Sequence, residues 1–502
     1  MVGRRRRRGN ERERQTTVGP FQLPTARLNL LTANQVQQIH EASLAILAHT
    51  GVVFDSPSAL AHFRQAGARL EGQRVFLDRT LIEAALAAAP PSYTLHARNP
   101  AYTITIDRDH CAVMPGGGPP YVLDLDGRRR PGTLADVENF ARLSAHAPNI
   151  HVMTRKPVEA QDLDPAVRHL ACWRAILTLT DKPVQSGFPG GQAEAEDALQ
   201  MLALVNGGEA ALVDRPLAHC SVNANSPLRF DRAMLESLIT FAGYGQPVLV
   251  SSFVMAGVTG PATLAGTVAQ HNAEVLAGLV LTQLVRPGTP FLYGTATSNA
   301  DLRNAAPAIG SPESALSIAA CAQLARFYGL PCRGGGALTD APQPDAQSHY
   351  ERTFTLLTSF LSGINYLMHG LGILESYLTI SYTQFALDLE LLSMVRHFLQ
   401  PLEVSDDTLA LETIAAVGPG GHFLDAEHTL QRFRSVHFLP HISLRQPFEQ
   451  WLAEGGTDPL TRANQRCRDL LADYQKPAIA SDIEAALDDF VRQRTVAILS
   501  AA

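Results

Sequence analysis

Positions that could meet a ligand recur along the 502-residue chain, each soon after a short apolar run. They are mainly glycines, aromatic residues and amides, with a few ionisable groups: 116–118, Tyr121, Phe188, Asn223, Asn225, Phe253, Tyr293, Thr295, 334–340, His369 and Glu375. Glycine lets a large ligand approach the backbone closely. Cations are scarce in this set, which argues against a phosphate site. Its His and carboxylate density is also too low for a di-metal hydrolase.

The segment GGGALTDAPQPDAQ (334–347) concentrates these features. Three glycines open it, Thr339 and Asp340 follow, and two prolines then stiffen the chain before a helix expected at about 345–362. Asp340 has two readings of equal weight, a site carboxylate or the residue that forms an Asx turn in its own loop.

Eight short apolar runs precede the candidate positions, and a helix-length amphipathic stretch follows each one. The runs are 111–115, 151–155, 183–187, 217–222, 247–253, 289–294, 330–335 and 364–369. Eight strands alternating with helices predict an α/β protein with a (β/α)8 TIM barrel, whose active site lies at the C-terminal ends of the strands. A doubly wound sheet is the competing fold, but GGGPP at 116–120 lacks the spacing of its phosphate-binding fingerprint.

Helix signals divide the chain around this barrel. Thr32 with Gln35 predicts a capped helix over 30–51, and Ser311-Pro312 predicts another helix start. Thr133 with Asp136, and Asp164-Pro165, are similar signals. The expected order is a disordered basic tail, a mostly helical N-terminal module, the barrel, and a helical C-terminal extension that packs around the barrel exterior: 1–22, 23–105, 106–400 and 401–502.

The composition narrows the partners and the compartment. A net charge of −7 favours neither nucleic acid nor an anionic membrane surface, and no run of 18 apolar residues predicts a membrane span. The five arginines at 4–8 lack the apolar stretch of an export signal. Six scattered cysteines without metal-knuckle spacing predict no structural metal and fit a reducing cytoplasm.

Seven segments together carry a resemblance that covers nearly the whole chain. They are IHEASLAILAHTGV (39–52), MPGGGPPYVLD (114–124), NSPLRFD (225–231), VTGPATLAG (258–266), GSPESAL (310–316), GGGALTDAPQPDAQ (334–347) and VGPGGHFL (417–424). The chain resembles the trimethylamine/glycine-betaine corrinoid methyltransferase family. Any one of these segments alone would be a weak signal.

The resemblance implies a barrel that moves a methyl group from an amine to the Co(I) corrin of a small partner protein. Cobalamin would then be presented by a corrinoid-binding protein rather than bound permanently. Trimethylamine enzymes of the family carry a pyrrolysine, which aligns near Ala341, Pro342 and Gln343, ordinary residues in this chain. A quaternary amine leaves as a neutral tertiary amine and needs no further activation. The resemblance therefore implies a quaternary substrate such as a betaine, carnitine-like or choline-like compound.

The resemblance also suggests roles for the candidate residues. Aromatic faces bind quaternary ammonium groups. The substrate-binding candidates are Tyr121, Phe253, Tyr293 and Tyr350 as aromatic faces, His349, Asn223, Asn225, His369 and Arg333 as donors to a carboxylate, and Gly117 and Gly335 as points of close approach. Asp340, Glu375 and His369 are the catalytic candidates, the two carboxylates as balance for the substrate cation. The chief catalytic demand is alignment of cobalt, carbon and nitrogen.

Structural roles compete with several of these assignments. Tyr293 and Phe253 could equally pack in the core, and His369 could be a hydrogen-bonded core histidine. Two other functions also compete: a non-catalytic quaternary-amine binding or sensing protein on the same barrel, and a Schiff-base lyase that would use Lys156 near the end of the second strand. The sequence leaves the oligomeric state open, a homo-oligomer included.

Overall fold

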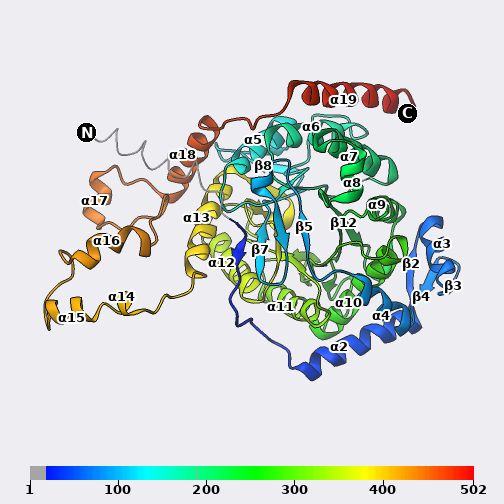
Figure 1. Cartoon of the computed structure of the whole chain (residues 1–502), viewed down its shortest axis with the longest axis horizontal. Coiled ribbons are helices and arrows are strands. Elements are labelled where there is room, and N and C mark those ends of the chain that lie inside the picture. The colour runs from blue at the N-terminus through cyan, green and yellow to red at the C-terminus, as the bar shows by residue number, and fades with distance from the viewer. Residues whose placement is uncertain (1–18, 189, 502) are drawn as a thin grey trace.

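A central sheet of parallel strands forms the middle of the computed structural model, which describes residues 19–188 and 190–501 (Figure 1). The strands, in order around the sheet, are β7 (His110–Val113), β20 (Tyr366–Met368), β19 (Cys332–Gly335), β16 (Phe291–Thr295), β14 (Val248–Ser252), β12 (Ala218–Ala224), β11 (Val184–Gln185) and β10 (Met153–Thr154). The backbone N–H groups of His151 and Val152 donate to the carbonyl oxygen of Val113 at 2.9 and 3.3 Å, which bridges β10 to β7. Each strand overlaps one of the eight predicted runs, so the predicted (β/α)8 barrel is confirmed.

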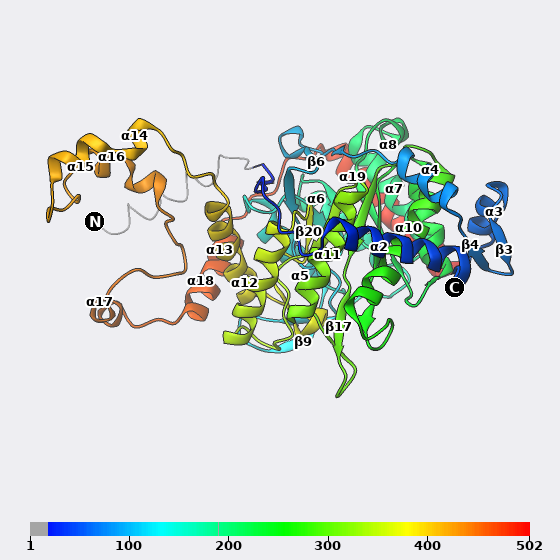
Figure 2. The same ribbon diagram turned by 90° about the horizontal axis from the view of Figure 1, so that it is seen from below.

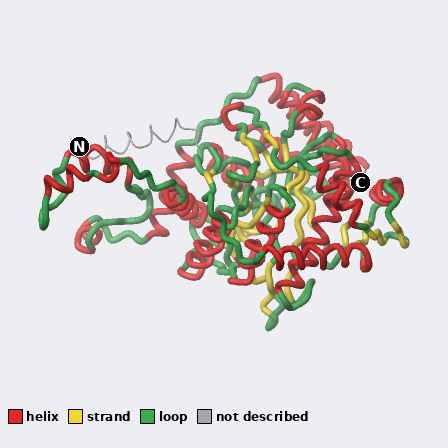
Figure 3. The backbone as a smooth tube through the Cα atoms, turned by 60° about the horizontal axis from the view of Figure 1, so that its bottom comes forward, coloured by secondary structure: helices red, strands yellow, loops and turns green. Residues whose placement is uncertain are grey.

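A ring of helices covers the outside of these strands (Figure 3). The helices are α5 (Leu134–Ala145), α6 (Arg168–Leu179), α7 (Gln192–Asn206), α8 (Glu209–Asp214), α9 (Arg232–Gly243), α10 (Leu264–Val285), α11 (Pro312–Phe327), α12 (Ala346–Leu361) and α13 (Tyr382–Phe398). The capping box at Thr133 and the N-cap at Ser311 are confirmed. Asp164 does not cap a helix directly: its carbonyl accepts from the N–H groups of Val167 and Arg168, and α6 begins after this turn.

A two-stranded plug closes the N-terminal end of the barrel. It consists of β5 (Tyr93–Leu95) and β6 (Ile104–Ile106), which are joined by η2 (Pro100–Tyr102). The chain then continues into β7. Its apolar side chains form one buried cluster with inward-facing residues of the strands, among them Ala112, Leu249, Leu292 and Tyr366. The Tyr93 hydroxyl lies 2.6 Å from Nε2 of His219 on β12. The interior is therefore filled at this end, and a ligand must enter from the other.

Burial of His219 predicts loss of stability in acid. Burial lowers its pKa from 6.5 to about 3. Between these values the unfolded chain binds a proton that the folded chain does not, so the free energy of unfolding falls as pH falls, by about 1.4 kcal/mol per pH unit. Glutamine in His219→Gln still offers Tyr93 a hydrogen bond but does not titrate. Urea unfolding across this window should show a slope against pH shallower by about 1.4 kcal/mol per unit; an unchanged slope would contradict the assignment.

The N-terminal module packs chiefly against α10. Its elements are α2 (Ala33–Ala45), η1 (Ile46–Thr50), β2 (Val52–Phe54), α3 (Pro57–Gln65), β3 (Arg69–Glu71), β4 (Arg74–Phe76) and α4 (Arg79–Ala88), with β13 (Arg229–Phe230) paired to β2. Thr32 and Gln35 form the predicted capping box. The predicted boundary of the disordered tail, 1–22, extends too far along the chain. Residues 21 and 22 form β1 (Phe21–Gln22), which pairs with β7, and Phe21 is buried against Phe360. The arginines at 4–8 lie outside the described residues.

Short strands surround the C-terminal ends of the barrel strands, the end called the mouth below. One sheet contains β21 (Ile373–Leu374), β22 (Thr379–Ser381), β8 (Tyr121–Leu123) and β9 (Arg129–Pro131); a second contains β15 (Met255–Ala256), β17 (Ser298–Asp301) and β18 (Ala306–Ala308). The single turn η3 (Glu375–Tyr377) joins β21 to β22. These elements are the β→α loops that the strand pattern placed at the active-site end.

The C-terminal extension has two parts that behave differently. Its helices are α14 (Asp406–Leu409), α15 (Leu411–Val417), α16 (Glu427–Val436), α17 (Phe448–Ala453), α18 (Pro459–Ala472) and α19 (Ser481–Ala501). As expected, α18 packs on α13 and α5, and α19 packs on α6 and α7. The expectation is wrong for α14–α17, which project from the body and hold no buried residue (Figure 1). No helix among the described residues is both long and apolar enough to cross a membrane.

Candidate active site

Three aromatic side chains meet at the mouth, two from one loop and the third from a distant part of the chain. His369 follows β20, Phe253 follows β14, and Tyr377 ends η3. The Tyr377 ring centroid lies 4.8 Å from that of His369 and 6.3 Å from that of Phe253. The backbone N–H of Gly117 points at Nδ1 of His369 at 3.4 Å. The structure thus brings together three predicted residues and one, Tyr377, that the sequence did not single out.

The backbone that presents Tyr377 is strained. His369, Glu375, Ser376 and Tyr377 all have positive φ, at 57°, 53°, 49° and 74°. Such left-handed conformations cost non-glycine residues on the order of 1–3 kcal/mol each and persist only when the surroundings enforce them. Four residues in this conformation therefore lie beside the rings at the mouth.

Asp340 enforces this turn. Its carboxylate accepts from Oγ of Ser376 at 2.6 Å and from the N–H groups of Ile309 and Gly310 at 2.9 and 3.0 Å. Burial raises its pKa, and these three donors oppose the rise. The carboxylate is thus engaged by its own chain, which favours positioning of Tyr377 over contact with a substrate cation.

Glu375 is held in the same way. Its carboxylate forms an ion pair with Arg129 at 2.8 Å and accepts from Oγ1 of Thr379 at 2.6 Å. The guanidinium of Arg129 in turn lies 3.6 Å above the centroid of the Tyr121 ring. One face of Tyr121 is therefore covered by a cation of the chain itself.

A buried cation without a counter-ion lies inside the barrel. Arg333 is 4 % exposed, and its Nη1 donates to the Thr295 carbonyl at 2.5 Å, but its Nε has no partner. Among the described residues no carboxylate forms an ion pair with it, and burial lowers its pKa. Burying an isolated cation is expensive. This arrangement suits an anionic group of a ligand.

The ladder pairing shows what surrounds Arg333. The inward-facing row across neighbouring strands contains Asn223, Ser251, Gly294, Arg333, Tyr366 and Ala112. The Asn223 side-chain oxygen accepts from Oγ of Ser251 at 3.0 Å. Asn223 and Arg333 therefore share one interior layer, as two of the proposed carboxylate donors should.

The electrostatics of the three rings follow from Arg333 and from burial. Burial first, and the Arg333 charge second, lower the pKa of His369 to about 3. Burial raises the pKa of Tyr377 to about 12. At neutral pH both side chains are uncharged. The mouth thus offers neutral aromatic faces together with the interior cation of Arg333.

The remaining predicted residues lie elsewhere. Side chains alternate along a strand, so Tyr293, next to inward-facing Leu292, points outward, where its hydroxyl donates to Asn272 of α10 at 3.0 Å. The core reading of Tyr293 is the one its position favours. A Cβ at Gly335 would lie 2.5 Å from Cδ1 of Leu338, so this glycine faces a side chain of its own chain rather than open space.

Two further candidates lie on α12, outside the barrel. Nδ1 of His349 lies 2.6 Å from the carbonyl oxygen of Asp345, the N-cap of that helix. Tyr350 is 64 % exposed on the outer surface. Neither contacts the three rings, because a helix in the outer ring directs only one of its faces toward the strands. Within the described ranges, no three His, Cys, Asp or Glu side chains are grouped to hold a metal ion.

A positioning role for Asp340 can be tested directly. Asp340→Asn replaces one accepting oxygen with a donor that faces other donors, at a cost of about 1–3 kcal/mol. We expect kcat/KM to fall about three- to tenfold as Tyr377 loses its fixed orientation, which is no more than loss of the whole aromatic face would cost. Asp301→Asn is the matched control, since Asp301 bonds Arg303 of its own turn. If Asp340→Asn melted earlier but kept full kcat/KM in steady-state assays, Asp340 would be purely structural.

Known proteins resemble this chain over nearly its whole length. The sequence profile described as "Trimethylamine methyltransferase (MTTB)" matches residues 2–498. The chain is 41% identical over 466 residues to a glycine betaine methyltransferase of Desulfitobacterium hafniense, covering 93% of this chain and 97% of the relative. It is 34% identical over 464 residues to a trimethylamine methyltransferase of the same species, covering 91% and 92%.

A solved structure agrees on the fold. The monomethylamine methyltransferase of Methanosarcina barkeri superposes with a TM-score of 0.50 at 9% identity, over 94% of this chain and 98% of that one. At that identity the likeness concerns the fold alone, and it matches the barrel described above. Both Desulfitobacterium relatives are methyltransferases, and the profile match spans the N-terminal module, barrel and C-terminal extension together. The chain is therefore an enzyme that transfers methyl groups and belongs to the trimethylamine methyltransferase (MTTB) family.

Proposed function

We propose that this enzyme demethylates a betaine, a small molecule that carries both a quaternary ammonium and a carboxylate. The observation that carries the proposal is the buried, unpaired Arg333 beneath three neutral aromatic rings. A carboxylate would neutralise Arg333, with Asn223 in the same layer. The ammonium would then lie against the faces of Phe253, Tyr377 and His369, which recognise a cation that cannot donate hydrogen bonds.

The methyl acceptor in this proposal is the Co(I) corrinoid of a partner protein presented at the mouth. In-line attack on a methyl carbon breaks the C–N bond, whose electron pair stays on nitrogen, and a neutral tertiary amine leaves. The cobalt supplies both electrons of the new bond. No proton moves, which fits a site whose His369 and Tyr377 stay neutral at working pH. The chain's contribution is to bind the substrate and hold one methyl group in line.

Two observations favour a quaternary over a tertiary amine. The loop after β19 contains only ordinary residues, where trimethylamine enzymes of the family are expected to carry pyrrolysine. Its two acidic side chains, Asp340 and Asp345, accept hydrogen bonds from the chain itself. A quaternary amine needs no activating group, so this loop needs none either.

The competing functions receive less support. A non-catalytic binding or sensing role is not indicated by the relatives, which are named for methyl transfer. A Schiff-base lyase would need a free lysine at a strand end, but Nζ of Lys156 forms an ion pair with Glu159 at 2.5 Å. The lyase gives no role to the unpaired Arg333, whereas a binding protein would use it in the same way as the enzyme, so methyl transfer itself distinguishes those two.

The test is an anaerobic assay of the purified protein with Co(I) cobalamin. Glycine betaine, proline betaine, carnitine, choline and trimethylamine would be supplied one at a time, and methylcobalamin would be followed by absorbance and mass spectrometry. Methyl transfer from a carboxylated quaternary amine, with little from choline or trimethylamine, is the expected result. Transfer from trimethylamine alone would refute the proposal. Tight binding of one betaine without transfer would favour the sensing role.

A further inference from the structure

The segment 402–436, called the arm below, exposes more apolar surface than a monomer would be expected to. It contains α14, α15 and α16, none of which has a buried residue. Ten large apolar side chains are exposed along it: Leu402, Val404, Leu409, Leu411, Ile414, Phe423, Leu424, Leu430, Phe433 and Val436. Summed along the arm, they expose roughly 1,000 Å² of apolar surface, whereas the largest contiguous patch of a typical monomer is about 300–600 Å².

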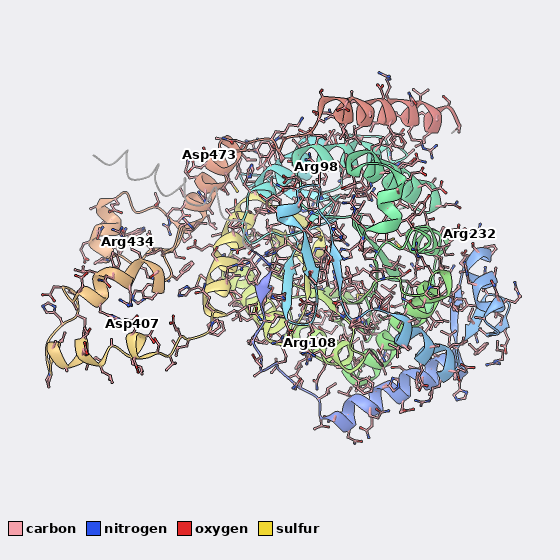
Figure 4. All side chains as sticks on the ribbon, viewed as in Figure 1. Arg98, Arg108, Arg232, Asp407, Arg434 and Asp473 are labelled. Carbon is pink, nitrogen blue, oxygen red and sulfur yellow. The ribbon has the colours of Figure 1, made fainter. Side chains whose placement is uncertain are left out.

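The arm is nevertheless a folded and anchored unit. Arg432 of α16 pairs with Asp407 of α14, and the backbone carbonyl of Asp407 lies 3.2 Å from Nε2 of His428. Beyond the arm, Glu390 of α13 accepts from the N–H groups of His441 and Ser443, at 2.9 and 3.0 Å. Figure 4 shows Asp407 and Arg434 together on the arm, away from the barrel. An arm fixed at its base and unpartnered along its length is built to contact something else.

The same chain carries a second unexplained apolar surface, on two helices of the outer ring. Tyr350 and Phe354 of α12 are 64 % and 51 % exposed, and Met394 and Phe398 of α13 are 40 % and 67 % exposed. The two helices are neighbours, joined by a buried ion pair. Each pair has helical spacing and so forms a stripe on one face. An outer face of a barrel helix is normally polar, so these stripes also lack a cover.

The location of the arm argues against the corrinoid protein as its partner. Helices of the ring run opposite to the strands, so α13 starts at the mouth and ends at the plugged end, where the arm leaves the body. In Figure 2, α14, α15 and α16 lie level with β6 of the plug, whereas β9 and β17 mark the mouth at the opposite edge. A protein that must deliver a corrin to the mouth would not be held there.

We infer that the arm docks on the α12–α13 face of a second copy of this chain. The arm of each copy then covers the α12–α13 face of the other. A two-fold axis relates the two contacts, as in other isologous dimers. Two such contacts reach the area of about 800 Å² per partner that stable interfaces bury. In both ribbon views the arm points away from its own body (Figures 1 and 2). Docking between two copies would therefore bury apolar side chains of the arm that folding within one copy leaves exposed.

The test measures the mass of the full chain by light scattering after gel filtration. Two variants add charge to one surface each: Leu411→Glu with Ile414→Glu on the arm, and Tyr350→Glu with Phe354→Glu on the face. Val258→Glu with Leu302→Glu is the matched control, at exposed positions of the mouth loops. We expect a dimer or a larger multiple for the wild type and the control, and 54.2 kDa for both surface variants. Circular dichroism should show that all the variants fold.

Mixing the two surface variants makes the test specific. The intact arm of the face variant can then dock on the intact face of the arm variant, so the mixture should form more dimer than either variant alone. A monomeric wild type, or an assembly that neither variant disrupts, would overturn the inference. So would a mixture that stays monomeric, because the intact arm and the intact face would then have met without binding. A face variant that stays dimeric would indicate an arm-to-arm dimer and would also overturn the inference. A wild type that gains mass only with a corrinoid protein would identify that protein as the partner instead.

Discussion

Arg333→Met should lower kcat/KM for a betaine by roughly 10²- to 10³-fold, because losing one member of a desolvated charge pair costs about 2–5 kcal/mol. The carboxylate is remote from the reacting methyl group and is held equally in the ground and transition states. The loss should therefore appear mainly as a higher KM, with kcat little changed. Steady-state methyl transfer under anaerobic conditions separates the two constants.

Stability distinguishes this explanation from simple damage to the core. Arg333 is buried without a counter-ion in the free enzyme, so its removal should raise the melting temperature. Arg352 is the matched buried arginine, but its Nη1 pairs with Asp388 at 2.8 Å. Arg352→Met strands that carboxylate and should cost about 3–5 kcal/mol. If Arg333→Met lost as much stability as Arg352→Met, Arg333 would be a structural residue and the carboxylate site would be wrong.

Tyr377→Ala should raise KM for a betaine about three- to thirtyfold, since an aromatic face contributes about 0.5–2 kcal/mol to cation binding. Tyr377→Phe keeps the face and should behave like the wild type. Charge leaves the substrate nitrogen in the transition state, so the ring stabilises the ground state more, and kcat should hold or rise slightly. Tyr121→Ala is the control, because Arg129 covers that ring.

A neutral ligand shows whether the ring recognises charge or only shape. 3,3-Dimethylbutyrate has the carboxylate and the shape of glycine betaine but no cation. The wild type should bind glycine betaine more tightly, measured as inhibition against substrate KM, and Tyr377→Ala should lose much of that preference. Equal weakening toward both ligands would mean that Tyr377 only fills space.

The sequence was sufficient for the barrel because its signals are local. Each of the eight apolar runs overlaps a strand, and the capping residues Thr32, Thr133 and Ser311 all begin helices. The caps are hydrogen bonds within three or four residues, and the apolar runs are read from residue types along the chain, so neither signal needs a distant contact to be recognised. The strand ends then located Phe253, His369 and Asn223, since barrel geometry fixes which end holds the site.

The direction of a side chain depended on register, which the sequence alone did not determine. Tyr293 and Leu292 are adjacent in one apolar run, and a shift of one residue exchanges their faces. The pairing of Gly294 with Arg333 fixes which of them points inward. Tyr121 and Glu375 similarly looked available, yet each is occupied by Arg129, a residue distant from Glu375 in the chain.

Three features required the tertiary structure. Tyr377 reaches the mouth only because Asp340 holds a left-handed turn through Ser376, and no glycine or proline announces that turn. Arg333 stood among several possible donors until burial showed that it alone of them is a cation without a carboxylate partner among the described residues. The exposure of the arm likewise depends on the tertiary structure, which shows that α14, α15 and α16 do not pack on the body. Local patterns determined the elements and their order; long-range contacts decided which side chains are free to bind.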